Sequence, residues 1–256
     1  MVGASARDLV LHYGYGSRIE RATADIDVGI EVPSWDAFQV LKEKLLEGGF
    51  SPTDAEHRLL SPDGTEVDII PFGPIEDEHA EIAWPPDGDW VMNVLGFSEA
   101  LENAQDVRIQ EEPVVEIPVA TPEGMVLLKL IAWVDRTPDM RSRDAKDLKY
   151  LLSTYENIPE VENELHQNQE LMEGYNWDLT LAAAYQLGVD AEAIAEDPTF
   201  DAIAELLEDD REKLSVETLI EEMSRRDQSD YEQNETLLNA FIDGFLSGSN
   251  DEDASN

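Results

Sequence analysis

The chain has 256 residues, 42% of them hydrophobic, which is enough for one large domain or two modest ones built around a real core. Lys and Arg number 17 against 58 Asp and Glu, and the formal charge of −41 argues against a strong general nucleic-acid binder and against an anionic membrane surface as partner. The absence of cysteine excludes disulfide frameworks, thiolate zinc sites and cysteine nucleophiles.

Acidic residues are spread over every segment of the chain, and lysine is scarce among the basic residues. This composition is typical of halophilic cytoplasmic proteins, because molar intracellular salt screens the repulsion between carboxylates. An ordinary acidic protein is the alternative. The longest apolar stretch, Met125–Val134, contains Lys129 and is too short to span a membrane, so we expect a cytoplasmic protein with no membrane partner.

The first half of the chain alternates helical and extended patterns. Polar–apolar alternation with period two predicts strands, and the Pro62-Asp63-Gly64 turn predicts a hairpin. In chain order we expect a helix over 7–13 opened by a turn at 3–5, a strand over 24–32, a helix over 35–48, hairpin strands over 58–61 and 66–72, and a mixed region over 75–112.

The second half is helical almost throughout. After a strand over 114–120, Thr121 and Pro122 are typical of a helix start, and this helix should run to about Val134. Further helices are expected from Asp144 onward. The sequence therefore predicts an α+β fold: a small mixed sheet with flanking helices in a core domain over 1–120, an all-helical domain over 121–246, and a disordered acidic tail over 247–256.

Three carboxylates on the predicted strands could form a metal site. Side chains alternate along a strand, so Asp25 and Asp27 lie on the same face, and Asp68 lies on the second strand of the hairpin. If the two strands are neighbours, the three carboxylates converge. Carboxylate oxygens are what Mg²⁺ needs when substrate phosphates supply its other ligands. Acidic residues are so frequent here, however, that these three fit a solvated surface as well.

Several short motifs add to the carboxylates. A small-residue turn, Val2-Gly3-Ala4-Ser5, precedes Arg21-Ala22-Thr23-Ala24-Asp25-Ile26-Asp27, and the later helix carries Lys129, followed by Arg136 and Arg143-Asp144-Ala145-Lys146-Asp147. In this order, over about residues 2–155, the chain resembles the nucleotidyltransferase superfamily that includes polymerase β. It is most similar to the AbiEii-type toxin nucleotidyltransferases and their uncharacterised relatives.

The resemblance implies a role for each matching residue. Asp25 and Asp27 would bind Mg²⁺, and Asp68 would bind metal or act as the base on an acceptor hydroxyl. The phosphates and the nucleotide would be held by Gly3, Ser5, Arg21 and Lys129, of which Lys129 would pair with the triphosphate. Asp144 would orient Lys129 or the nucleotide, with Asp147 as the competing choice.

Basic residues gather near these motifs, with a cluster over 129–149. Phosphate binding is one reason for a cluster of cations in so acidic a chain, and ion pairing on a helix surface is the alternative. Lys129 stands out because it interrupts an apolar helix, so it should either reach a site or extend to solvent.

We therefore expect a Mg²⁺-dependent enzyme that moves a nucleotide from an NTP to the hydroxyl of an unknown acceptor: RNA, protein or a small molecule. It would be a candidate toxin with a cognate antitoxin. The alternative is an inactive nucleotidyltransferase-fold scaffold that binds a protein partner. In the family a strand precedes the glycine turn, whereas only Met1 and Val2 precede Gly3 here, so we expect the native start to lie upstream.

Overall fold

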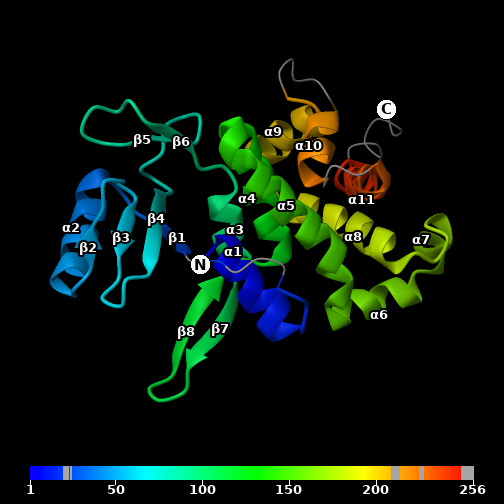
Figure 1. Ribbon diagram of the computed structural model, residues 1–256, viewed down its shortest axis with the longest axis horizontal. Helices are drawn as coiled ribbons and strands as arrows, with labels where there is room; N and C mark the ends of the chain where they lie inside the picture. The colour runs from blue at the N-terminus through cyan, green and yellow to red at the C-terminus, as the bar shows by residue number, and fades with distance from the viewer. Residues whose placement is uncertain (20–22, 24, 209–213, 225–227, 249–256) are drawn as a thin grey trace.

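The computed structural model describes residues 1–19, 23, 25–208, 214–224 and 228–248. Figure 1 shows a small sheet flanked by one helix on one side of the molecule and a larger helical body on the other. The expected α+β fold with a helical C-terminal region is confirmed. Arg21 and residues 249–256 of the predicted tail lie outside the described residues.

The main sheet has four strands in the order β1-β4-β3-β2. β1 and β4 run parallel, whereas β3 pairs antiparallel with both β4 and β2, so the expected mixed sheet and hairpin are confirmed. The strands are β1 (Asp25–Glu31), β2 (Ser51–Pro52), β3 (Arg58–Leu60) and β4 (Glu66–Phe72).

Helix α2 (Trp35–Glu47) packs beside this sheet, and the Ser34 side chain accepts a hydrogen bond from the Ala37 amide at its start. Phe38 of α2 belongs to a small apolar core with residues of β3 and β4. The region between β4 and residue 112 contains β5 (Glu81–Ala83), β6 (Val91–Asn93), α3 (Phe97–Glu102) and the start of the next hairpin.

Three boundaries differ from the expectation. The first helix begins at Gly3, as α1 (Gly3–Arg7), and continues as the π-helical η1 (Asp8–Gly14), because Gly3 adopts a positive φ of 71° that lets the helix start directly after Val2. Helix α5 (Pro138–Thr154) begins before Asp144, because Pro138 occupies its first turn. The strand expected near 114–120 is β8 (Val115–Val119), which pairs with β7 (Gln105–Gln110) in a separate hairpin that projects from the body (Figure 1).

The helical half surrounds the larger core, which also contains Ala6, Val10 and Leu11 from the first helix. No helix among the described residues is long and apolar enough to cross a membrane. The division of the chain at residue 120 stays a prediction. The helices are α4 (Pro122–Asp135), α5, η2 (Tyr155–Asn157), α6 (Pro159–Gln167), α7 (Gln169–Gly174), α8 (Leu179–Ile194), α9 (Asp197–Leu207), α10 (Val216–Met223) and α11 (Gln228–Phe245).

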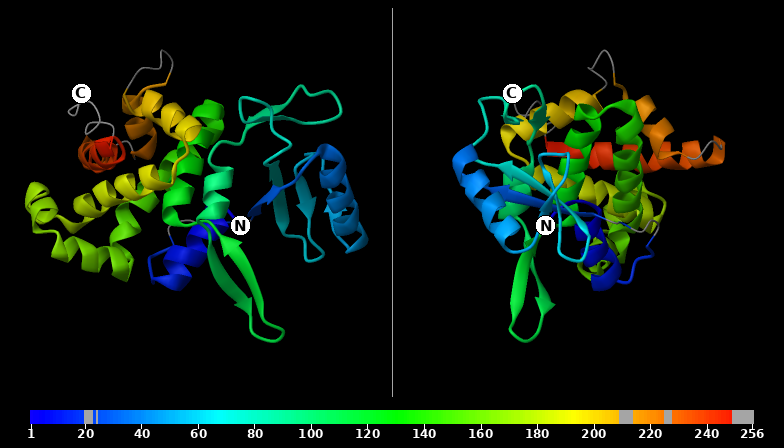
Figure 2. Two further views of the ribbon diagram at one scale, coloured as in Figure 1. Left: turned by 180° about the vertical axis from the view of Figure 1, so that it is seen from behind. Right: turned by 60° about the vertical axis from the view of Figure 1, so that its left-hand side comes forward.

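The first two residues connect the main sheet to the projecting hairpin. The Val2 amide donates to the Asp27 carbonyl at 3.0 Å, the Met1 ammonium donates to the Pro118 carbonyl at 2.7 Å, and the Ala120 amide donates to the Met1 carbonyl at 3.0 Å. Met1 and Val2 therefore lie between β1 and the end of β8, beside the candidate carboxylates. Figure 2 shows the same junction from behind, with the N-terminus at the centre of the molecule.

Candidate active site

The carboxylates expected to converge do lie on neighbouring strands. Asp27 of β1 is the register partner of Asp68 of β4, and Asp25 lies two residues before Asp27 in the same strand. Burial, together with the nearby charges of Asp25 and Asp68, raises the pKa of Asp27 to about 6, although Lys129 opposes the shift. The carboxylates are thus close enough to repel one another.

Arg58 holds the third carboxylate. Its Nε and Nη2 atoms donate to the two oxygens of Asp68 at 2.6 and 2.8 Å, and it also pairs with Glu66. The neighbouring His57 places Nε2 3.8 Å from Asp68, and burial lowers the pKa of His57 despite that carboxylate. Within the part of the chain described, the buried Nδ1 of His57 has no hydrogen-bond partner.

The start of α1 packs against the strand carboxylates. A side-chain Cβ at Gly3 would lie only 2.0 Å from Oδ2 of Asp27, so only glycine fits there without moving Asp27. The Ser5 hydroxyl donates to the Asp25 carbonyl at 2.8 Å, which fastens α1 to β1. Thr23 donates to the Asp25 carboxylate at 2.9 Å.

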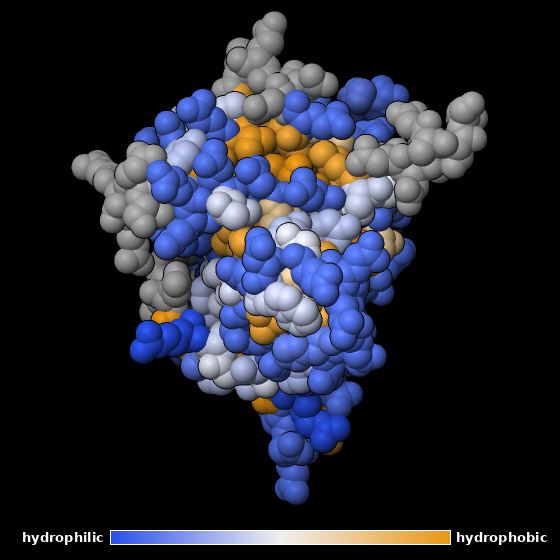
Figure 3. Space-filling view, turned by 90° about the vertical axis from the view of Figure 1, so that its right-hand side faces the viewer, coloured by the Kyte–Doolittle hydropathy of each residue, from blue (hydrophilic) through white to orange (hydrophobic). Residues whose placement is uncertain are grey.

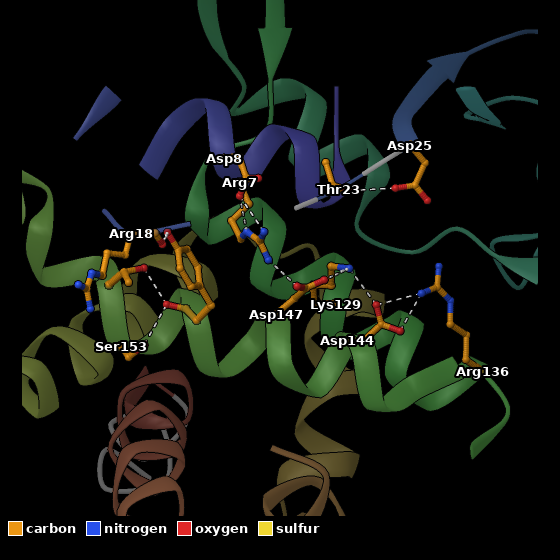
Figure 4. Close-up of polar contacts among 12 residues, drawn as sticks. Arg7, Asp8, Arg18, Thr23, Asp25, Lys129, Arg136, Asp144, Asp147 and Ser153 are labelled. Carbon is orange, nitrogen blue, oxygen red and sulfur yellow. Dashed lines mark hydrogen bonds and ion pairs between the residues drawn. The ribbon is translucent and has the colours of Figure 1, made fainter. Parts of the chain in front are cut away.

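Lys129 lies between two carboxylates of the next helix (Figure 4). Its Nζ is 2.9 Å from Asp144 and 2.8 Å from Asp147, while Arg136 binds the other side of Asp144 at 2.8 Å. Burial lowers the pKa of Lys129, but the two carboxylates outweigh it, so the net shift is upward and the lysine is an ammonium. Both residues proposed as its partner therefore contact it.

Two of the three strand carboxylates, Asp27 and Asp68, line a cavity of about 140 Å³ together with Lys129, whereas Asp25 does not line it. Arg136 and Asp144 line the same cavity. The cavity is also lined by Val2, Gly3, His57, Ile70, Met92, Asn93, Leu95, Phe97, Leu128, Ile131, Ala132 and Asp135. Two groups more than sixty residues apart in the chain thus meet at a single site.

Other cations of the 129–149 cluster have acidic partners in the helical body. Arg141 pairs with Glu222 at 2.7 Å and lies over the Trp133 ring, and Lys149 pairs with Asp230 at 2.6 Å. These contacts support the ion-pairing explanation for Arg141 and Lys149.

Arg7 was expected only as one of the cations near the first motif, and sequence reasoning missed its contact with Asp147 as well as the positions of His57 and Arg58 near the cavity. The position of Arg58 beside Asp68 could have been predicted, because a hairpin centred on Asp63 places residue 58 opposite residue 68. The register of β3 and β4 has this pairing. His57 shows no metal-ligand spacing in the sequence, and nothing there indicates its position. Arg7 pairs with Asp147 at 2.6 Å across 140 residues, and no local pattern reports such a contact.

As the side chains stand, no three His, Asp or Glu residues in the described part of the chain are arranged to hold a metal ion. Arg58 accounts for part of this, since it binds both oxygens of Asp68.

Acidic side chains on a small mixed sheet that share a cavity with a lysine of a later helix are what a nucleotidyltransferase requires, and the chain belongs to this class of enzyme. The family model described as "Nucleotidyl transferase AbiEii toxin, Type IV TA system" matches residues 2–255, so the chain is a member of that family. The match extends through the helices after residue 155, for which no resemblance was expected. A comparison with curated proteins gives no match.

Proposed function

We propose that the chain transfers a nucleotide from an NTP to an acceptor hydroxyl with the help of Mg²⁺, in the cavity between Asp27 and Lys129. The observation that carries this proposal is that two strand carboxylates, Asp27 and Asp68, line the same cavity as Lys129 and Arg136. Carboxylates attract a divalent cation, and the two basic side chains attract phosphate oxygens.

The oxygen donors are of the kind that a hard divalent cation binds, although their side chains would have to turn toward one another to hold it. Asp25 and Asp27 would supply oxygen ligands from β1. Asp68 would supply a third ligand once Arg58 releases one or both of its carboxylate oxygens. Burial and repulsion from Asp25 and Asp68 raise the pKa of Asp27, and a bound cation would relieve that repulsion. When bound, Mg²⁺ would neutralise phosphate charge and align the reacting oxygens.

In the transfer, the acceptor oxygen attacks the α-phosphorus, the bond from that phosphorus to the bridging oxygen breaks, and pyrophosphate leaves with the electron pair. The acceptor's proton passes to a carboxylate, for which Asp68 is our candidate. Lys129 and Arg136 stabilise the charge on the phosphate oxygens. Gly3 leaves space beside Asp27, and Asp144 and Asp147 keep Lys129 charged and in place.

The cavity is smaller than the roughly 300–1,000 Å³ of sites that enclose a whole drug-sized ligand, so the nucleotide would be only partly enclosed. The acceptor, whether RNA, protein or small molecule, would approach from the open side. Membership in a Type IV toxin–antitoxin family supports an antitoxin as partner and the cytoplasm as the site of action.

A scaffold that binds a partner without catalysis is the second candidate. The bidentate pairing of Arg58 with Asp68 favours it, because this pairing occupies a carboxylate that the enzyme would need.

Calorimetry in molar KCl decides between them. Each of the four NTPs is titrated with Mg²⁺ into the native chain and into the Asp25→Ala/Asp27→Ala variant. The enzyme proposal expects binding that is lost in the double variant. The matched control is Glu162→Ala/Glu164→Ala, which removes two exposed acids from α6 and should bind normally. Absence of binding to the native chain, or equal binding to both chains, supports the scaffold.

A further inference from the structure

Six charged side chains form one alternating series that passes from the first helix to the edge of the cavity (Figure 4). Among the described residues, Asp147 and Asp144 each contact two cations of this series, and the atoms that join neighbours lie 3.0 Å or less apart. In order, the series is Asp8, Arg7, Asp147, Lys129, Asp144 and Arg136.

Arg7 is fixed within this series by contacts on several sides. Its side chain is 4% exposed; Nε and Nη2 donate to one oxygen of Asp8 at 2.9 and 2.7 Å, and Nη1 donates to Asp147 at 2.6 Å. Its guanidinium carbon lies 4.7 Å from the centre of the Tyr150 ring. A planar fork of donors can meet two carboxylates and a ring at once, whereas a lysine ammonium cannot reproduce that geometry.

The position of Lys129 depends on the carboxylate that Arg7 holds. Asp144 and Asp147 are three residues apart on one face of α5, and Lys129 Nζ lies between them. An ammonium has three donors, and these two contacts use two of them, on a residue that lines the cavity. If Asp147 turns, Lys129 loses one of the two contacts that direct it.

We propose that Arg7 is a positioning residue, which holds Lys129 in the cavity by fixing the carboxylate of Asp147. Arg7 does not line the cavity, so it acts through Lys129 and not on the substrate. With Arg7 removed, the series has two cations for three carboxylates, and Lys129 is drawn toward Asp147 and away from phosphate. The effect on nucleotide binding rests on the proposed function, whereas the coupling of Arg7 to Lys129 does not.

A double-mutant cycle measures whether Arg7 acts through Lys129. The four NTPs, each with Mg²⁺, are titrated into the native chain, Arg7→Met, Lys129→Met and the double variant. We expect Arg7→Met to weaken binding about tenfold when Lys129 is present and to have little effect when Lys129 is already replaced. Equal losses in the two backgrounds would overturn the proposal.

Two further variants distinguish the positioning of Lys129 by Arg7 from a general loss of structure caused by replacing an arginine in an ion pair. Arg141→Met is the matched control, because Arg141 also combines an ion pair, here partly buried, with an aromatic contact, and its partner is Glu222 and not a carboxylate that holds Lys129. The affinity of this variant should stay normal. Arg7→Lys keeps the charge and should restore part of the affinity. A loss with Arg141→Met as large as with Arg7→Met would contradict a role specific to Lys129.

Unfolding in urea tests the same cycle without any nucleotide. Arg7 and Lys129 share the buried carboxylate of Asp147, so the variant that lacks both cations should have an unfolding equilibrium constant raised about tenfold beyond the product of the two single effects. Additive effects would overturn the proposal. If no NTP binds the native chain while this coupling is present, the proposed function fails and the positioning of Lys129 stands.

Discussion

Gly3 shows how closely the first helix approaches the strand carboxylates. Its φ of 71° is one that side-chain-bearing residues avoid, and a Cβ would also lie 2.9 Å from the Cβ of Asp27, so the whole Asp27 side chain would have to move. We expect Gly3→Ala to cost about 1–2 kcal/mol of stability and to abolish Mg²⁺-dependent NTP binding, measured by urea unfolding and calorimetry.

Gly64→Ala is the control for backbone strain alone. Gly64 has a φ of 87°, with no atom within 4 Å of a Cβ placed there. The Gly64→Ala variant should lose a similar amount of stability and bind NTP with Mg²⁺ as the native chain does. If Gly64→Ala also lost binding, strain and not displacement of Asp27 would be responsible.

Asp27 should make stability depend on pH. Its pKa is about 6 in the folded chain against an ordinary value of 3.8, so between these pH values the folded chain keeps a proton that the unfolded chain releases. The contribution of Asp27 to stability therefore falls as pH rises from about 4 to 6. Asp27→Asn, which cannot ionise, should be more stable than the native chain at pH 7 by about 3 kcal/mol, and the difference should vanish near pH 4.

The measurement is urea unfolding of both chains at several pH values, in molar KCl with a chelator. Asp87→Asn, which changes an exposed carboxylate of a loop, should show no such crossover. A constant difference between Asp27→Asn and the native chain across this pH range would show that burial and repulsion do not act on Asp27 as described.

At the scale of elements, two glycines determine how closely α8 and α11 pack. A Cβ at Gly188 would lie 2.3 Å from the Phe241 carbonyl oxygen, and one at Gly244 would lie 2.0 Å from the Tyr185 carbonyl oxygen. These are backbone atoms, so the helices would have to separate. Alanine favours a helix by about 1 kcal/mol over glycine, but the clash outweighs this, and each Gly→Ala change should destabilise the chain by about 3 kcal/mol.

Thermal and urea unfolding check this expectation, with Gly174→Ala as control. Gly174 ends α7 and has no atom within 4 Å of a Cβ placed there, so its replacement should change stability little. Stability unchanged by Gly188→Ala would mean that the two helices are not in backbone contact.

The elements also show what local sequence can predict. Alternation predicted β1 and β4, and a turn with fixed geometry predicted the β3–β4 hairpin, because these signals lie within a few residues. Local signals do not predict the parallel pairing of β1 with β4, because this pairing brings together strands about forty residues apart in the chain. The contacts from Arg7 to Asp147 and from Arg58 to Asp68 involve single side chains, so no periodic pattern predicts them.

At the scale of the whole molecule, several cations of the described residues join parts of the chain that are distant in sequence. Arg7, Lys129 and Arg141 each have an acidic partner in or near the buried interior. The face in Figure 3 is mainly hydrophilic, with an apolar area in its upper part. With a formal charge of −41, this surface repels itself in dilute buffer.

Salt should therefore stabilise the folded chain. Raising KCl from 0.1 to 1 M shortens the Debye length from about 10 to about 3 Å, so repulsion between surface carboxylates is screened while the buried pairs around Lys129 keep most of their strength. We expect the midpoint of thermal unfolding to rise by at least about 10 °C over this range. Replacing the exposed Glu162, Glu164, Glu170 and Glu173 with glutamine removes four charges and should make that rise smaller. A midpoint that did not change with KCl would show that the charge is not what limits stability, and the halophilic interpretation of the composition would fail with it.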